Sequence, residues 1–355
     1  MNKYRWIDKL LLPLTWISVF ALLFSYLAYF LKPSLFVSVS FLGLAYPILL
    51  LIVLLWFLFW LFRFKRILII PLLSVLVGWG HLSAFFPWGG NEAIPDGNKN
   101  IRVTSLNSRF FDQSYWDPDF DLLGALDQFF RAEQAHIIAL QEFNPNRIVP
   151  TLENKEYIRT RGKSKLAIYS KLPVVGSGDR LFPSHISYGS NGFQWIDVLF
   201  SGDTLRIYNC HISSNQLEHS QVELIEKVDE ITTDKINSKW GAMYTLLKTG
   251  FLFREKQIEE LRAHIDLSPY PVLIVGDFND TPTSHAYKQM TQTLTDAYRS
   301  HGRGWGKTYR KSLIPLRIDY HFHDEYLESN FVKVKKVAVS DHYPLIGHYS
   351  WSFRD

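Results

Sequence analysis

Three long runs within the first 90 residues contain no Asp, Glu, Lys or Arg, and only a few residues separate them. They cover residues 10–31, 34–62 and 67–88. A bilayer-spanning helix needs roughly 20 apolar residues, because only a helix satisfies its own backbone hydrogen bonds in hydrocarbon. One such run is also typical of a buried core helix, but three in succession predict a membrane region of three transmembrane helices over residues 1–90.

The pattern changes after residue 90. Residues 91–100 are polar and contain glycine, proline and asparagine, a composition typical of a linker. Beyond them, apolar runs of strand length alternate with amphipathic patterns, which predicts one domain of the α/β or α+β class over residues 101–355. Strands are expected at 101–106, 137–140, 166–169, 195–200, 205–209, 272–275, 317–320 and 334–339, and helices at 121–134, 217–229 and 251–267.

Charge separates the same two parts. Residues 1–90 carry seven basic side chains and one acidic one, whereas the remaining 265 residues carry 31 basic and 33 acidic side chains. The basic excess of the whole chain therefore belongs to the membrane region and does not indicate a nucleic-acid-binding face. Six basic residues flank the first run on its N-terminal side or lie between the second and third runs, and one lies between the first and second. The positive-inside rule then predicts a cytoplasmic N-terminus and, after three spans, an extracytoplasmic or periplasmic C-terminal domain.

Polar residues follow five of the apolar runs, where strands are expected to end. The clusters are Asn107, Gln141-Glu142, Asn209-Cys210-His211, Gly276-Asp277-Phe278-Asn279, and the late pair Asp319 and Asp341-His342. Singly, Asn and Asp at such places are ordinary turn residues. Together, the carboxylate and amide oxygens suit a hard cation such as Mg²⁺ or Mn²⁺, and the two histidines add acid–base capacity. These are the parts that hydrolysis of a phosphoester requires.

Several other chemistries are excluded. The single cysteine, Cys210, rules out an internal disulfide and a cysteine-based zinc site, and it gives no sign of a disulfide-linked partner. The chain has no glycine-rich phosphate loop, nucleophile elbow or His-Glu-x-x-His helix.

The order of these clusters resembles the endonuclease/exonuclease/phosphatase superfamily. That group includes pancreatic-type deoxyribonuclease, abasic-site endonucleases, inositol polyphosphate 5-phosphatases and neutral sphingomyelinases. The resemblance covers about residues 101–349, and Gly-Asp-Phe-Asn with a terminal Ser-Asp-His is its most specific part. It implies a four-layer sandwich of two mixed β-sheets flanked by helices, with the site at the strand ends. With the three N-terminal helices, the chain is similar to a membrane-anchored, bacterial-type member.

The resemblance also implies metal ligands. Glu142 would be the principal ligand, helped by Asn107, with Asp341 at a second position if two ions bind. The ion would be Mg²⁺ or Mn²⁺.

Catalytic roles are implied in the same way. Asp277 and Asn279 would position the attacking water and the phosphate, and His211 would bind a phosphoryl oxygen. His342, oriented by Asp319, would be the base or the phosphate-stabilising group. The sequence leaves open whether Asp277 or His342 accepts the proton from water.

The expected substrate contacts come from two further segments. An apolar stretch, residues 240–253, lies in the long connection between His211 and Gly276. It either dips into the bilayer and covers a lipid tail, or forms a helix packed on the domain. Arg254, just after it, and Thr308, in the basic segment 307–311, are expected to bind substrate.

The leading hypothesis is a membrane-anchored, metal-dependent hydrolase of a phosphodiester or phosphomonoester that acts outside the cytoplasm. Its partners would be the phosphoester substrate, namely a lipid head group, nucleic acid or small phosphate ester, and the lipid bilayer. An extracytoplasmic endonuclease, a lipid or head-group phosphodiesterase, and a non-catalytic phospholigand receptor on the same fold remain as alternatives. A transporter is disfavoured, because the three runs carry no intramembrane charge for a pathway.

Overall fold

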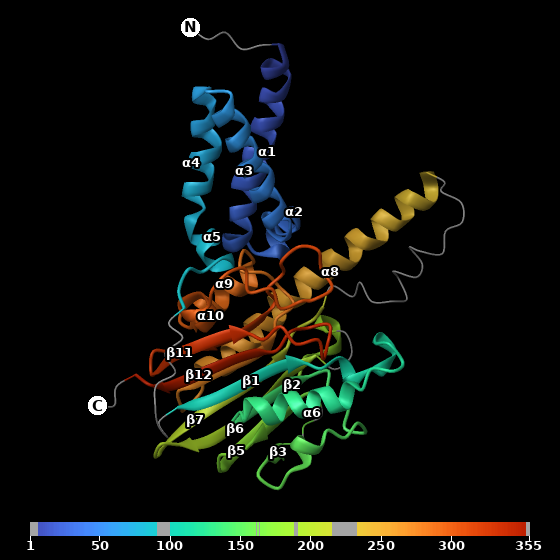
Figure 1. Ribbon diagram of the computed structural model, residues 1–355, viewed down its shortest axis with the longest axis vertical. Helices are drawn as coiled ribbons and strands as arrows, with labels where there is room; N and C mark the ends of the chain where they lie inside the picture. Colours follow the sequence, from blue (N-terminus) through green and yellow to red (C-terminus); the bar gives the residue numbers. More distant parts are fainter. Residues whose placement is uncertain are drawn as a thin grey trace.

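The computed structural model describes residues 6–90, 100–160, 162, 164–187, 191–214 and 233–352 (Figure 1). A helical N-terminal bundle stands on one side of a domain built from two β-sheets. Residues 91–99 of the expected linker and the whole expected helix 217–229 lie outside the described residues.

The N-terminal bundle consists of α1 to α5. Helix α1 (Trp6–Phe30) is unbroken, α2 (Pro33–Leu44) and α3 (Tyr46–Phe62) meet at 54°, and the η1–α4 segment (Arg66–Leu68 and Ile69–Val77) meets α5 (Trp79–Phe85) at 63°. Among the described residues, α1 alone is long and apolar enough to span a membrane as one helix; counting each bent pair as one span gives up to three. The expected second and third helices are therefore both bent.

Each β-sheet has six strands and one central parallel pair. The first sheet has the order β11 (Leu327–Val334), β12 (Leu345–Trp351), β1 (Ile101–Asn107), β2 (Ile137–Gln141), β4 (Ala167–Ser170), β3 (Ile158–Thr160). The second has the order β5 (Val174–Leu181), β6 (Gly192–Phe200), β7 (Asp203–His211), β8 (Val272–Asp277), β10 (Asp319–His323), β9 (Thr295–Asp296). The pairs β1–β2 and β7–β8 are parallel and the other pairings are antiparallel, so both sheets are mixed.

The layers follow from three apolar cores. One core lies between the sheets and includes Val103, Ala139, Ile207 and Val275. A second joins the first sheet to α6 (Leu122–Glu133), and a third joins the second sheet to α8 (Thr233–Asp266) and α9 (His285–Thr291). This is the expected sandwich of two mixed sheets flanked by helices. Short elements complete it: α10 (Ala297–His301), η2 (Arg109–Phe111), η3 (Gln113–Tyr115), η4 (Pro150–Glu153) and η5 (Ser184–Ile186).

The expected strand 334–339 is wrong. Strand β11 ends at Val334, and the chain that follows makes no regular ladder. Its alternating valines nevertheless pack inward, since Val339 is buried and Val337 lies against the same core as α6. The alternation of apolar and polar residues here reflects alternating burial of side chains in a segment that does not pair as a strand. The sequence does not predict strands β3, β5, β9, β11 and β12, and the expected helix 251–267 is the C-terminal half of the longer helix α8.

The N-terminal bundle shares its packing with the domain. Ala84 of α5 lies in the same apolar core as Phe278 and Tyr287. The fully buried guanidinium of Arg317 donates a hydrogen bond of 2.7 Å to the Ala84 carbonyl oxygen. Removal of the bundle would therefore expose part of the domain core.

Candidate active site

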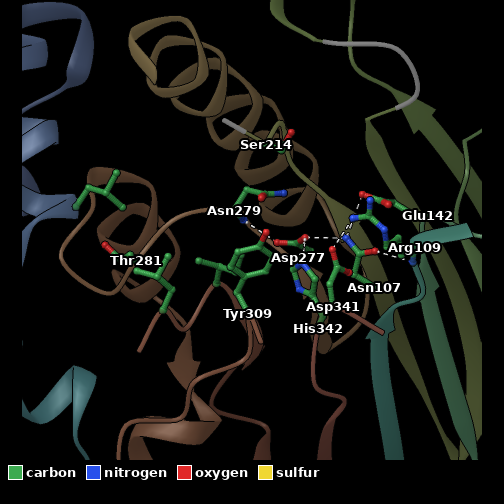
Figure 2. A pocket seen from close by; sticks show the side chains of 13 residues that line it. Asn107, Arg109, Glu142, Ser214, Asp277, Asn279, Thr281, Tyr309, Asp341 and His342 are labelled. Carbon is green, nitrogen blue, oxygen red and sulfur yellow. Dashed lines mark hydrogen bonds and ion pairs between the residues drawn. The ribbon is translucent and has the colours of Figure 1, made fainter. Parts of the chain in front are cut away.

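The expected site residues come together at one end of the two sheets (Figure 2). Asn107 ends β1, Glu142 directly follows β2, and Asp277 ends β8. In the parallel pairs β1–β2 and β7–β8, Asn107 pairs with Gln141 and His211 pairs with Asp277. The polar ends of these strands therefore lie at the same edge of each sheet. His342 comes from the loop between β11 and β12.

The site surrounds a pocket of about 170 Å³. Its lining includes six of the expected residues, together with seven that the sequence does not predict. The lining residues are Leu44, Asn107, Arg109, Glu142, Ser214, Asp277, Asn279, Thr281, Tyr309, Leu316, Ile318, Asp341 and His342.

The side-chain amide of Asn107 joins the two sheets of the site. Its Nδ2 donates to Asp277 Oδ2 at 3.0 Å and to Glu142 Oε1 at 3.3 Å. His211 Nε2 lies 3.6 Å from Glu142 Oε1 and 3.9 Å from Asp277 Oδ2. Oxygens of two converging carboxylates are the ligands that a hard divalent cation prefers, so Glu142 and Asp277 fit Mg²⁺ or Mn²⁺. Asn107 turns its amide nitrogen toward them, and its Oδ1 would serve as a ligand after the amide group turns over.

Asp277, Asp319 and His342 form a second, overlapping cluster. Asp319 pairs directly with Asp277 in the β8–β10 register, and the ligand atoms of all three residues lie within 4.8 Å of one another. His342 Nδ1 is 2.9 Å from Asp319 Oδ2, and His342 Nε2 is 3.8 Å from Asp277 Oδ2.

Burial and neighbouring charges separate the acid–base properties of this cluster. Burial and then the Asp319 carboxylate raise the pKa of Asp277 to about 6, against the opposing effect of His342 and His211. Burial alone would lower the pKa of His342, but the Asp319 and Asp277 carboxylates outweigh it and raise this pKa to about 10. At neutral pH the cluster therefore holds an ionised Asp277 beside a protonated His342.

The backbone around the Gly-Asp-Phe-Asn motif explains its residue types. Gly276 has a φ of +139°, and a Cβ there would lie 2.1 Å from the Cys210 carbonyl oxygen, so only glycine fits. Asn279 has a φ of +51°, a conformation that asparagine tolerates better than most residues. Its backbone amide donates to Asp277 Oδ1 at 2.9 Å, and its side-chain Nδ2 donates to the Ile212 carbonyl at 3.0 Å.

Asp341 is bound to Arg109, which the sequence analysis missed. Arg109 NH1 lies 2.6 Å from Asp341 Oδ2, and the Arg109 backbone amide donates to Asn107 Oδ1 at 3.1 Å. The guanidinium therefore balances the charge of the Asp341 carboxylate, which the resemblance implies as a ligand of a second ion. The sequence offers one sign of its role, since Arg109 lies only two residues after the expected site residue Asn107.

Three expected substrate-binding residues, His211, Arg254 and Thr308, are not among the residues that line the pocket, and the last two are fully enclosed. Arg254 is 1 % exposed; its Nε donates to Asp280 Oδ2 at 3.0 Å and its NH1 donates to the Ser213 carbonyl at 3.1 Å. Thr308 is fully buried, and its hydroxyl accepts hydrogen bonds from the backbone amides of Ile318 and Asp319. Both residues therefore position the loops and strand that carry the site. Their polar side chains suggest substrate contacts in the sequence, because the sequence does not show which polar side chains are buried.

Gln141 and Asn209 also hold the strands that carry the site in position. Both are fully buried, and Gln141 Nε2 donates to Asn209 Oδ1 at 2.6 Å across the two sheets. Asn209 Nδ2 donates in turn to the carbonyl oxygens of Leu140 and Ala167. This bridge fixes the distance between the strand ends that carry Glu142 and His211.

Residues 105–342 match the family model described as Endonuclease/Exonuclease/phosphatase family. Residues 8–85 match a domain of unknown function. A comparison with curated protein sequences finds no match.

Two solved structures of TDP2 from D. rerio share the fold. A humanized form with 14 mutations is 15% identical, with a TM-score of 0.53, and the match covers 71% of this chain and 99% of that one. The form complexed with single strand DNA product is 16% identical, with a TM-score of 0.52 and the same coverage. At this identity the likeness establishes the fold alone.

Proposed function

Because this chain belongs to the endonuclease/exonuclease/phosphatase family, which comprises divalent-metal-dependent hydrolases of phosphoester bonds, we propose that it is a membrane-anchored phosphoesterase. The observation that carries the proposal is the convergence of Asn107, Glu142, Asp277 and His342 in one pocket. The family resemblance implies metal binding for Asn107 and Glu142 and catalytic roles for Asp277 and His342.

In this proposal Glu142 and Asn107 hold one Mg²⁺ or Mn²⁺ ion. When bound, the cation supplies charge neutralisation for the phosphoryl oxygens and lowers the pKa of water near it. Asp341, paired with Arg109 at 2.6 Å, orders the neighbouring loop and takes no direct part.

Asp277 accepts the proton of the attacking water. Its pKa of about 6 leaves it mostly ionised at neutral pH yet basic enough to act as a general base. His342 stays protonated beside Asp319 and stabilises the charge of the phosphoryl oxygens, with His211 and Asn279 as further donors. Hydrolysis forms a bond from the water oxygen to phosphorus and breaks the bond to the leaving alcohol.

The N-terminal bundle anchors the enzyme with its domain outside the cytoplasm. The start of α1, the end of α3 and the start of α4 lie at the end of the bundle away from the domain (Figure 1). Arg63, which directly follows α3, pairs with the buried Asp8 near the start of α1 at 2.7 Å, and Lys65 and Arg66 lie between α3 and α4. Basic residues concentrate on the cytoplasmic side of membrane proteins, which supports this orientation. Three spans then carry residues 101–355 to the opposite side.

The test measures hydrolysis of bis(4-nitrophenyl) phosphate and 4-nitrophenyl phosphate by the full chain in detergent, with and without Mg²⁺ or Mn²⁺. The full chain is needed because Ala84 and Arg317 tie the bundle to the domain core. We expect metal-dependent turnover that Glu142→Gln abolishes. Absence of turnover from folded, metal-binding protein would instead favour a phospholigand receptor.

A further inference from the structure

One wall of the active-site pocket comes from the N-terminal bundle. Leu44, the last residue of α2, lines the pocket together with the apolar side chains of Leu316 and Ile318. The other lining residues are mostly polar and include Asn107, Glu142, Asp277, Asn279 and His342. Figure 2 shows the ribbon of the N-terminal helices, in blue, at the Thr281 side of the site.

Specific contacts hold α2 in this place. At its start, the Ser34 amide and hydroxyl donate to the buried Glu255 carboxylate of α8 at 2.8 and 2.7 Å, which caps the helix from another element. At its end, the Thr283 hydroxyl donates to the Gly43 carbonyl at 2.8 Å. A Cβ on Gly43 would lie 2.5 Å from Ala28 Cβ, so glycine permits α1 and α2 to pack this closely. The position of Leu44 is thus fixed from both ends of its helix.

The apolar stretch at 240–253 contributes to the same arrangement. Phe41 of α2 stacks on Tyr244 at 5.1 Å between ring centroids and contacts Phe251 edge-on at 5.3 Å. The stretch therefore packs, from Tyr244 onward, against the N-terminal bundle, while the first half of α8 extends beyond the domain (Figure 1). Neither of the two expectations for this stretch foresaw contact with α2.

An exposed apolar stripe lies along α3, the helix that follows α2 after a bend of 54°. It begins four residues after Leu44 and consists of Ile48, Leu51, Leu55 and Leu58, which are 43, 58, 57 and 43 % exposed. Their spacing of three and four residues places them on one helix face. From Ile48 to Leu58 the helix α3 rises about 15 Å, which is about the roughly 15 Å of one bilayer leaflet. Lipid acyl chains would lie along this stripe in a membrane.

The pocket itself admits only a small group. Its volume of about 170 Å³ lies below the roughly 300–1,000 Å³ of sites that enclose a whole ligand. A phosphate with a short alcohol fits such a space, and the remainder of a larger substrate must lie outside it.

We propose that the substrate is a phosphoester in the head group of a bilayer lipid. Its apolar part stays along α3, and its phosphate enters the pocket past Leu44. This inference rests on the proposed phosphoesterase activity. The N-terminal bundle is then part of the substrate site as well as an anchor.

The experiment compares three probes with the full chain reconstituted in the presence of Mg²⁺ or Mn²⁺. The first is a set of vesicles of phosphatidylcholine containing phosphatidylethanolamine, phosphatidylglycerol, cardiolipin or sphingomyelin. The second is soluble bis(4-nitrophenyl) phosphate, and the third is a single-stranded DNA oligonucleotide. Phosphorus NMR and mass spectrometry of the products give the rates. Leu44→Asn is compared with Leu76→Asn, the same change at a half-exposed leucine of α4 outside the pocket lining.

We expect hydrolysis of at least one lipid in vesicles. The ratio of the vesicle rate to the soluble-diester rate should fall about tenfold in Leu44→Asn, since burial of a leucine side chain is worth at least that factor, and stay unchanged in Leu76→Asn. Turnover of the soluble diester without any vesicle turnover, preferential cleavage of DNA, or an equal change of the ratio in both variants would overturn the lipid inference alone. Failure to hydrolyse the soluble diester as well would overturn the proposed function with it.

Discussion

His342 Nδ1 lies 2.9 Å from Asp319 Oδ2, and this contact joins the loop between β11 and β12 of one sheet to β10 of the other. A carboxylate on Nδ1 fixes the ring orientation and directs Nε2 toward the pocket. Asp319 pairs with Asp277 in the register of β10 and β8. The Oδ2 atom of Asp277 lies 3.8 Å from His342 Nε2. One carboxylate thus orients the imidazole, and the other lies beside the nitrogen that faces the substrate.

Asp319→Asn should lower turnover about 10²- to 10⁴-fold, the usual range for losing a positioned acid–base group. Without the carboxylate, burial lowers the pKa of His342, so residual activity should gain a dependence on pH near neutrality. The pH profile of bis(4-nitrophenyl) phosphate hydrolysis measures both effects. Asp324→Asn, at the other end of β10, is the matched control. Normal turnover with an unchanged profile would remove His342 from the mechanism.

Glu142→Gln should weaken binding of the divalent cation. In the native protein Mg²⁺ or Mn²⁺ should raise the melting temperature, because a ligand that binds only the folded state stabilises it by about 2.7 kcal/mol at 100 times its Kd. The variant should lose this shift. Differential scanning fluorimetry with and without the ion gives the answer independently of activity. Glu153→Gln, at an exposed site on η4, should keep the shift; equal shifts in all three proteins would contradict the assignment.

Arg254→Met should destabilise the domain by about 3–5 kcal/mol, because it leaves the Asp280 carboxylate buried without its guanidinium. Denaturant unfolding of the full chain in detergent measures the loss. Asp280→Leu combined with Arg254→Met should recover part of it. Arg131→Met breaks the exposed pair with Asp127 and should cost about 1 kcal/mol or less. Unchanged stability with weakened substrate binding would restore Arg254 to the substrate-binding group.

His321 should make the protein sensitive to acid. It lies between the sheets, with Nε2 at 2.9 Å from Ser105 Oγ and Nδ1 at 2.7 Å from Tyr349 Oη, and burial lowers its pKa to about 3. The unfolded chain takes up a proton below about pH 6.5 and the folded one does not, so stability is complete above that pH and falls toward pH 3. At pH 5 the loss from this residue is about 2 kcal/mol.

The measurement is the decrease in melting temperature between pH 7.5 and pH 5. It should be smaller in His321→Gln than in the native protein. His185→Gln, at an exposed position, should behave as the native protein does. An equal decrease in all three would mean that His321 is not the titrating group.

The orientation can be tested with single introduced cysteines, since the native Cys210 is fully buried and should not react. Glu325→Cys, exposed on the domain, should react with a membrane-impermeant maleimide in intact spheroplasts. Phe64→Cys, 87 % exposed at the far end of the bundle, should react only after permeabilisation. The reverse pattern would place the domain in the cytoplasm.

Features that depend on local composition follow from the sequence alone. Uncharged runs of sufficient length predict spans whatever they pack against, and short apolar runs that end in polar residues located most strands and the residues of the site. Where burial and pairing diverge, as at Val337 and Val339, the same pattern predicted a strand that is absent.

The contacts of each polar side chain, in contrast, depend on the three-dimensional packing of the chain. Arg254 and Thr308 are residue types that often bind substrate. In the fold both are buried and form hydrogen bonds with residues 26 and 11 positions away along the chain. Arg109 reaches Asp341 over 232 positions, and Leu44 joins a pocket whose other residues begin at Asn107. Such contacts depend on how separate elements pack in space. Local sequence specifies which element forms, and the choice of its neighbours is made by the whole fold.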